Sequence, residues 1–213
     1  PEIGVASTKA FTAQVAAAYG RFLSEVGRYD EAERYLTEAL ERWISAGNRH
    51  GEAWTSVDLG DLAQLRGQFD TARATYDAAR SVAEDINDQG RVGTVLAYLG
   101  GLAKTLGQFD EAERLYRQSL AVGAQADNVW AEAGAYLGLG ALARDRARYQ
   151  DALAHFAQAE RLFARTGGEL AAVSPRFQVG ATHLAQGDYD QALAAFEDAR
   201  RRYAAAQFED AGL

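Results

Sequence analysis

The chain has 213 residues, 48% of them hydrophobic, and no cysteine, which excludes disulfides, thiolate catalysis and thiolate metal sites. Its 22 basic and 30 acidic side chains give a formal net charge of −8, which argues against nucleic acid as a direct partner. No apolar run approaches the roughly 18 residues of a membrane span and no signal-peptide pattern opens the chain, so we expect a cytoplasmic protein without a membrane partner. Because it begins at Pro1 and contains no methionine, we expect it to be a piece of a longer protein, bacterial in composition.

Helices separated by short turns are predicted along nearly the whole chain. Apolar residues such as Val57, Leu59 and Leu62 recur with the period of a helix rather than the alternation of a strand. The ninth helix is expected to start late, because Ser174 and Pro175 are typical of a cap followed by proline in the first turn. The expected helices cover residues 8–26, 29–46, 50–66, 69–86, 90–106, 109–125, 129–146, 149–166, 174–186 and 189–207.

A repeat of 40 residues (60 − 20 = 40) organises the sequence. The repeat is marked by five glycines in predicted helices: Gly20, Gly60, Gly100, Gly140 and Gly180. Seven residues after each, a turn element with an aromatic residue follows, as in Gly67-Gln-Phe-Asp70. A fixed period between about 20 and 50 residues is the signature of a solenoid.

The recurring glycines predict close packing between helices. A glycine inside a helix costs about 1 kcal/mol relative to alanine, so its recurrence indicates a neighbouring helix too near for a β-carbon. Glycines such as Gly67 are expected to end helices in the left-handed conformation. The aromatic residues that follow, such as Phe69 and Phe109, are expected to fill the space between units.

The pattern from Leu59 to Tyr76, Leu-Gly-x₂-Ala-x₃-Gly-x-Phe-Asp-x-Ala-x₃-Tyr, resembles the tetratricopeptide repeat (TPR). The resemblance recurs five times and implies an all-α fold, a right-handed superhelix (α-solenoid) of about five helix-turn-helix pairs. We expect the array to cover residues 8–213, in units of about 8–46, 47–86, 87–126, 127–166 and 167–207.

In this family the first helix of each pair lines a concave groove, and the resemblance places ten candidate residues there. These peptide-binding candidates are Arg21, Trp54, Val57, Asp61, Gln64, Thr94, Lys104, Leu137, Arg144 and Phe177. Repeats that clamp a terminal carboxylate often carry asparagine after the mid-helix glycine, but this chain has Arg21 and Asp61 there, so a chaperone-tail receptor is not expected. Small residues such as Gly101 and Gly134 fit a roomy groove for a peptide, and equally fit close packing alone.

Residues 1–14 match none of the later units. The stretch from Glu2 to Lys9, Glu-Ile-Gly-Val-Ala-Ser-Thr-Lys, resembles a segment of the sugar-isomerase domain of glutamine–fructose-6-phosphate aminotransferase. The resemblance implies that Val5 and Ser7 would lie near a sugar phosphate. Because the rest of that domain is missing from this sequence, we expect no isomerase activity and interpret the stretch as a fused or fortuitously joined segment.

No other motif points to chemistry. His50, His155 and His183 are spread over a turn and two helices without the spacing of metal ligands, so packing or surface roles are favoured. We therefore expect no enzyme activity, no metal and no cofactor.

The sequence favours a scaffold that binds a protein or peptide in the groove. Two alternatives stay open: a ligand-sensing TPR domain of a bacterial transcriptional regulator or nucleotide-switch protein, and an engineered or purely structural scaffold. The terminal helices are expected to expose faces through which the chain forms a homo-oligomer.

Overall fold

The computed structural model describes residues 2–166 and 169–210, and the side chains from Ala10 onward except those at 167–170, 172 and 206–213. All regular secondary structure in these ranges is helical. In chain order the helices are α1 (Glu2–Glu25), α2 (Tyr29–Ser45), α3 (Arg49–Leu65), α4 (Phe69–Asp85), α5 (Gln89–Thr105), α6 (Phe109–Gln125), α7 (Val129–Asp145), α8 (Tyr149–Arg165), α9 (Glu169–Gln186) and α10 (Tyr189–Asp210).

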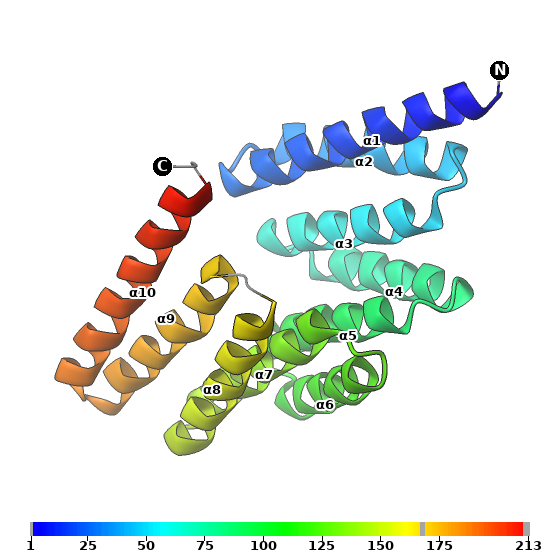
Figure 1. The fold of residues 1–213 in the computed structure, drawn as a ribbon. Helices are drawn as coiled ribbons and strands as arrows, with labels where there is room; N and C mark the ends of the chain where they lie inside the picture. The colour runs from blue at the N-terminus through cyan, green and yellow to red at the C-terminus, as the bar shows by residue number, and fades with distance from the viewer. Residues whose placement is uncertain (1, 167–168, 211–213) are drawn as a thin grey trace.

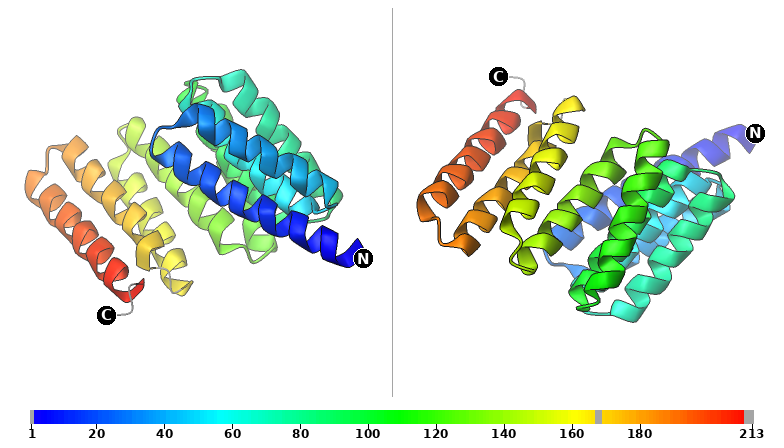
Figure 2. Two further views of the ribbon diagram at one scale, coloured as in Figure 1. Left: turned by 90° about the horizontal axis from the view of Figure 1, so that it is seen from above. Right: turned by 90° about the horizontal axis from the view of Figure 1, so that it is seen from below.

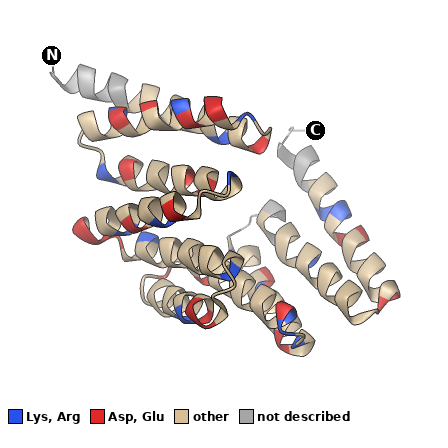
Figure 3. Cartoon of the chain, turned by 180° about the vertical axis from the view of Figure 1, so that it is seen from behind, with Lys and Arg blue, Asp and Glu red and all other residues tan. Residues whose placement is uncertain are grey.

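The helices form consecutive helix-turn-helix pairs that stack into a curved array (Figure 1). The pair α1 and α2 lies at one end and the pair α9 and α10 at the other, as the two further views show (Figure 2). The predicted all-α solenoid is therefore confirmed. Acidic and basic residues alternate along the helices (Figure 3).

The predicted helix ends are accurate to one residue for α2 to α8, and three other ends differ by more. The last helix ends at Asp210 instead of residue 207. The ninth helix begins at Glu169, not at residue 174, and continues through Pro175. Pro175 lacks one backbone N–H but is fully buried, and packing of this kind can hold a helix across a single missing hydrogen bond. The first helix begins at Glu2, so the stretch that matches no other unit runs without a break into the first repeat.

Glycines end several helices in the left-handed region, as expected. The φ angles of Gly67 and Gly107 are both 73°. The residue after each glycine then donates its N–H to a carbonyl five positions earlier, at 2.8 Å from Gln68 to Ala63 and 2.9 Å from Gln108 to Ala103. These bonds satisfy carbonyls that the end of the helix leaves unpaired, so the turn between paired helices is both short and fixed.

Between units, the next helix is started by a polar cap. The side chains of Asn48, Asp88 and Asn128 each accept a hydrogen bond from the backbone N–H three residues later. An N-cap bond of this kind stabilises a helix by about 1 kcal/mol. The caps recur with the same 40-residue spacing as the glycines (88 − 48 = 40), so the second, third and fourth units begin their first helices in the same way.

Each of the five mid-helix glycines faces a large side chain from the second helix of its own unit, 16 residues later (76 − 60 = 16). A β-carbon built on Gly60 would lie 2.5 Å from the Tyr76 ring, and one on Gly100 would lie 2.8 Å from the Tyr116 ring. The predicted close approach is thus confirmed. The other pairs are Gly20 with Leu36, Gly140 with Phe156, and Gly180 with Phe196.

The aromatic residues at the starts of the second helices contribute less to the packing than the sequence suggested. Phe69 packs at the edge of the central core cluster, but Phe109 is 40% exposed and Tyr189 is 70% exposed. The space beside each first helix is filled instead by the side chain seven residues, or about two turns, further along the second helix, because that residue lies opposite the glycine.

Two neighbouring glycines test this packing directly. We expect Gly100→Ala to lower the free energy of unfolding, because forcing a group into a filled core costs about 1–3 kcal/mol and outweighs the gain in helix propensity of about 1 kcal/mol. Gly101→Ala should raise it by up to about 1 kcal/mol, because its β-carbon would lie 3.7 Å from the nearest atom, an ordinary contact. Denaturant unfolding of both variants measures the difference, and equal stabilities would contradict the account.

Candidate functional site

A groove of about 810 Å³ lies where α3, α5 and α7 face a common space. We call it the central groove. Its walls also include side chains from the second helices α6 and α8 and from the turn before α7. The lining residues are Trp54, Asp61, Gln64, Thr94, Ala97, Tyr98, Gly101, Tyr116, Asn128, Trp130, Gly134, Leu137, Gly138 and Phe163.

Five of the ten predicted residues line this groove: Trp54, Asp61, Gln64, Thr94 and Leu137. Val57 does not, and its prediction is wrong. It is 1% exposed and packs in the main core cluster, because the face of α3 that carries it turns toward the core rather than toward the groove.

The other four predicted residues lie outside the lining of the central groove. Arg21 lines a smaller neighbouring cavity of about 510 Å³ and pairs with Asp58 at 3.1 Å. Lys104 pairs with Asp145 at 3.0 Å, and Arg144 donates to Gln178 at 2.6 Å. These three bonds link first helices of adjacent units. Phe177 is 54% exposed and its ring centroid lies 5.1 Å from that of Phe196.

Sequence reasoning missed most of the aromatic wall of the groove. Tyr98 and Trp130 come from first helices at positions where other units carry Gly138 and Gly90, so the repeat itself gave no signal for them. Tyr116 and Phe163 come from second helices, which were not expected to reach the groove. The 16-residue spacing from glycine to ring could have indicated Tyr116.

Tyr116 reaches the groove because glycines flank it on both sides. A β-carbon on Gly100 of α5 would lie 2.8 Å from the ring, and one on Gly138 of α7 would lie 2.1 Å from it. The ring is therefore held between two helices of adjacent units. Burial and the charge of Asp145 raise the pKa of Tyr116 to about 12, so its hydroxyl stays protonated and able to donate.

A carboxyl group is embedded in the wall at the α3 side. Asp61 Oδ1 accepts a hydrogen bond from the Tyr76 hydroxyl at 2.5 Å. Burial raises the pKa of Asp61 to about 6, although the bond from Tyr76 acts in the opposite direction. Asp61 therefore carries a charge at neutral pH in a place that disfavours charge.

Asp58, one turn before Asp61, shares this environment. Burial raises its pKa to about 6, against the opposing effect of Arg21. Burial and the two carboxyl groups together raise the pKa of Tyr98 to about 12. The α3 side of the groove thus carries one carboxyl group, that of Asp61, while Asp58 lies outside the groove lining and acts on Asp61 through its charge.

The rim of the groove carries one cation that is already engaged. The Arg91 guanidinium stacks over the Trp54 ring at 4.4 Å from its centroid, and its Nε lies 3.0 Å from Asp88. Across the groove, the Trp130 and Phe163 ring centroids are 5.2 Å apart. The arrangement offers flat apolar surfaces, a few hydrogen-bonding groups and one acid. Within the described ranges no cluster of three or more histidine, aspartate or glutamate side chains could hold a metal ion.

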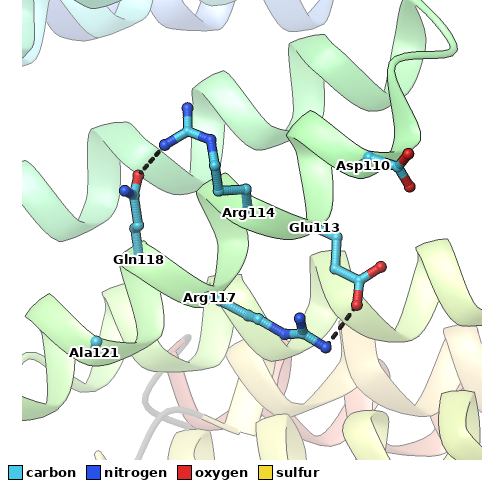
Figure 4. A pocket seen from close by; sticks show the side chains of 6 residues that line it. All are labelled: Asp110, Glu113, Arg114, Arg117, Gln118 and Ala121. Carbon is cyan, nitrogen blue, oxygen red and sulfur yellow. Dashed lines mark hydrogen bonds and ion pairs between the residues drawn. The ribbon is translucent and has the colours of Figure 1, made fainter.

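A second depression, of about 500 Å³, lies along α6 and is a weaker candidate (Figure 4). All six of its lining residues come from that helix, and its two arginines bond to other residues of the same helix. Arg117 pairs with Glu113 at 2.6 Å, and Arg114 donates to Gln118 at 3.0 Å. These bonds engage the cations of the depression within the helix itself, so the central groove is the better site.

Comparison with protein families gives a match over most of the chain. The model of the tetratricopeptide repeat matches residues 11–85, 55–125 and 132–205. No curated protein matches the chain. The likeness of residues 1–14 to a sugar-isomerase segment stays a prediction, and the side chains of Val5 and Ser7 lie outside the described residues. Among the described residues, no helix combines the length and the hydropathy that a membrane span requires.

Several solved structures share the fold at low sequence identity. BtubC (BKLC) from P. vanneervenii has a TM-score of 0.64 and 21% identity, over 96% of this chain and 91% of that one. A Rap protein solved in complex with Competence and Sporulation Factor has a TM-score of 0.77 and 16% identity, over 90% of this chain and 54% of that one. Aspartyl phosphate phosphatase F from Bacillus subtilis has a TM-score of 0.67 and 11% identity, over 92% and 60%. The chain thus spans only about half of the Rap protein.

The buried carboxyl group of Asp61 predicts a pH-dependent stability. Its folded-state pKa lies above the usual value of 3.8, so folding takes up a proton and the stability that the neutral form provides is lost as the pH rises from about 4 to about 6. We expect Asp61→Asn, which keeps an acceptor for Tyr76, to be more stable than the wild type at pH 7.5 by about 1–3 kcal/mol. Denaturation at pH 7.5 and pH 4.5 should show this advantage shrinking at the lower pH. An advantage that does not change with pH would refute the assignment.

Proposed function

The chain belongs to the tetratricopeptide repeat family, and we propose on that premise that it is a non-enzymatic scaffold that holds a segment of a protein partner, or a peptide, in the central groove. The observation that carries the proposal is the groove itself. It encloses a volume of about 810 Å³, and its walls include aromatic side chains from three consecutive units. No cofactor, nucleic acid or membrane enters the proposal. A cytoplasmic location and a bacterial source stay predictions from composition.

The exposure of the aromatic side chains supports binding rather than packing alone. Of the residues that line the groove, Trp130 on α7 is 57% exposed and Trp54 on α3 is 43% exposed. Large aromatic side chains left open in a concave surface are typical of places where a partner inserts apolar groups. Small residues between them, such as Ala97 and Gly134, leave room for an extended peptide or a helix.

The Rap protein structure supports the proposal by analogy only. Its bound Competence and Sporulation Factor shows that a solenoid of related shape was solved with another molecule held by it. At 16% identity the likeness concerns the fold, and the lining residues of the two proteins need not correspond.

A second function is supported by the size of the groove. Pockets for small molecules are commonly about 300–1,000 Å³, a range that includes this groove. The chain could therefore be the ligand-sensing domain of a bacterial regulator. A DNA-binding or nucleotide-switch module encoded in the same gene as the array would favour the sensor.

Filling the groove should abolish peptide binding. A random peptide library displayed on phage and selected on the wild-type protein should yield binders that lose at least about tenfold in affinity on Gly134→Trp, because this position opens into the groove next to Ala97. The control is Ala121→Trp on α6, which lies outside the central groove and should leave binding unchanged. Binders that tolerate Gly134→Trp, or a selection that yields none, would refute the proposed function.

We also propose that the chain associates with a second copy through its terminal helices. Phe11, Val15 and Phe22 fall on one face of α1 and are 67%, 53% and 53% exposed. The positions that correspond to Phe22 in the next three units, Leu62, Leu102 and Leu142, are at most 2% exposed. An apolar face that inner units bury is therefore left open on α1.

Light scattering at high protein concentration tests the association. We expect a dimer or larger assembly for the wild type and a monomer for Phe22→Glu, because a charge on this face opposes apolar contact. Ala121→Glu on α6 is the matched control and should leave the mass unchanged. A wild-type monomer at the highest accessible concentration would contradict the proposal.

A further inference from the structure

The central groove contains a carboxylate, that of Asp61, without a basic side chain among the described residues to pair with it. Asp61 is the one carboxylate among the residues that line it, and no basic side chain in the described part of the chain pairs with it. In the described part of the chain its one polar bond comes from a neutral donor, the Tyr76 hydroxyl. A carboxylate that is largely removed from water and has no cation beside it is energetically unfavourable in the free protein.

The cations nearest to the groove are all engaged elsewhere. Arg21 is taken by Asp58, Arg91 by Asp88 and the Trp54 ring, and Lys104 by Asp145. Arg144 bonds to Gln178 and lies 3.9 Å from Asp145. None of them compensates Asp61. Its only charged neighbour on α3 is Asp58, which adds repulsion rather than relief.

The walls around this carboxylate are suited to a cation. Tyr98 and Trp54 line the same groove, and aromatic faces attract ammonium and guanidinium groups by about 0.5–2 kcal/mol. The Arg91 guanidinium, 4.4 Å from the centroid of the Trp54 ring, shows that such stacking occurs at this rim. A long basic side chain could therefore lay its apolar stem along the rings with its charged end toward Asp61.

We propose that the partner segment inserts a lysine or arginine side chain into the central groove to pair with Asp61 between the aromatic walls. The inference rests on the proposed function and adds the chemistry of the partner: a basic and apolar peptide rather than an acidic one. The net charge of −8 also favours a basic partner, because it attracts basic segments and repels acidic ones.

A double-mutant cycle tests the pairing. The probes are peptides selected from a random display library on the wild-type protein and lost on Gly134→Trp. We expect them to contain a lysine or arginine whose replacement by norleucine, which keeps the stem and removes the charge, weakens binding to the wild type at least about tenfold. On Asp61→Asn the same replacement should change the affinity by less than about twofold. The matched control is Asp77→Asn on α4, a carboxylate that pairs with Arg80 outside the groove, on which the full tenfold loss should persist.

The outcomes separate this inference from the proposed function. Groove-dependent peptides without a basic residue, or a tenfold loss that persists on Asp61→Asn, would overturn the inference and leave the proposed function standing. Absence of any groove-dependent peptide would overturn both. Circular dichroism confirms that each variant is folded, and the amide introduced by Asp61→Asn keeps an acceptor for the Tyr76 hydroxyl.

Discussion

The fold depends on a contact between a helix position that has no β-carbon and a large side chain of the next helix. At each repeat a glycine in the first helix lets the second helix press a leucine, tyrosine or phenylalanine against its backbone, with built β-carbons 2.5 to 2.8 Å from that side chain. The glycine weakens its own helix by about 1 kcal/mol, and the burial of a ring or leucine returns about 1.5–3 kcal/mol. This contact occurs once in each of the five helix pairs, and it sets the distance between the two helices of every pair.

The groove follows from the same contact. In the third unit the Tyr116 ring packs against Gly100 and also against Gly138 of the following unit. Because neither glycine has a side chain, the ring fits between the two helices and reaches the groove. In the second unit the equivalent ring is Tyr76, and Tyr98 stacks on it with centroids 5.7 Å apart. One position thus carries Tyr98 in α5 and Gly138 in α7, and this alternation makes the central groove different from the surface of the other units.

The repeat made the fold predictable but not the site. Regular features, namely the helix-ending Gly67 and Gly107 and the mid-helix glycines, are imposed by backbone geometry that recurs in every unit, so spacing alone located them. The groove is built from positions where the units differ, such as Tyr98 and Trp130, and a repeat pattern contains no information about such differences. Val57 was misplaced because groove and core faces of α3 lie within one turn of each other. Pro175 was misread because a start signal cannot be distinguished from a buried proline without its neighbours.

Labelling the three tryptophans with fluorine tests most directly whether the central groove is the binding surface. Trp54 and Trp130 line the groove, whereas Trp43 is 9% exposed and lies outside it, so the chain supplies its own internal control. On addition of a library-selected peptide to the 5-fluorotryptophan protein, the account predicts that the fluorine resonances of Trp54 and Trp130 shift together and that of Trp43 does not. A shift confined to Trp43, or saturated binding that leaves Trp54 and Trp130 unchanged, would contradict it.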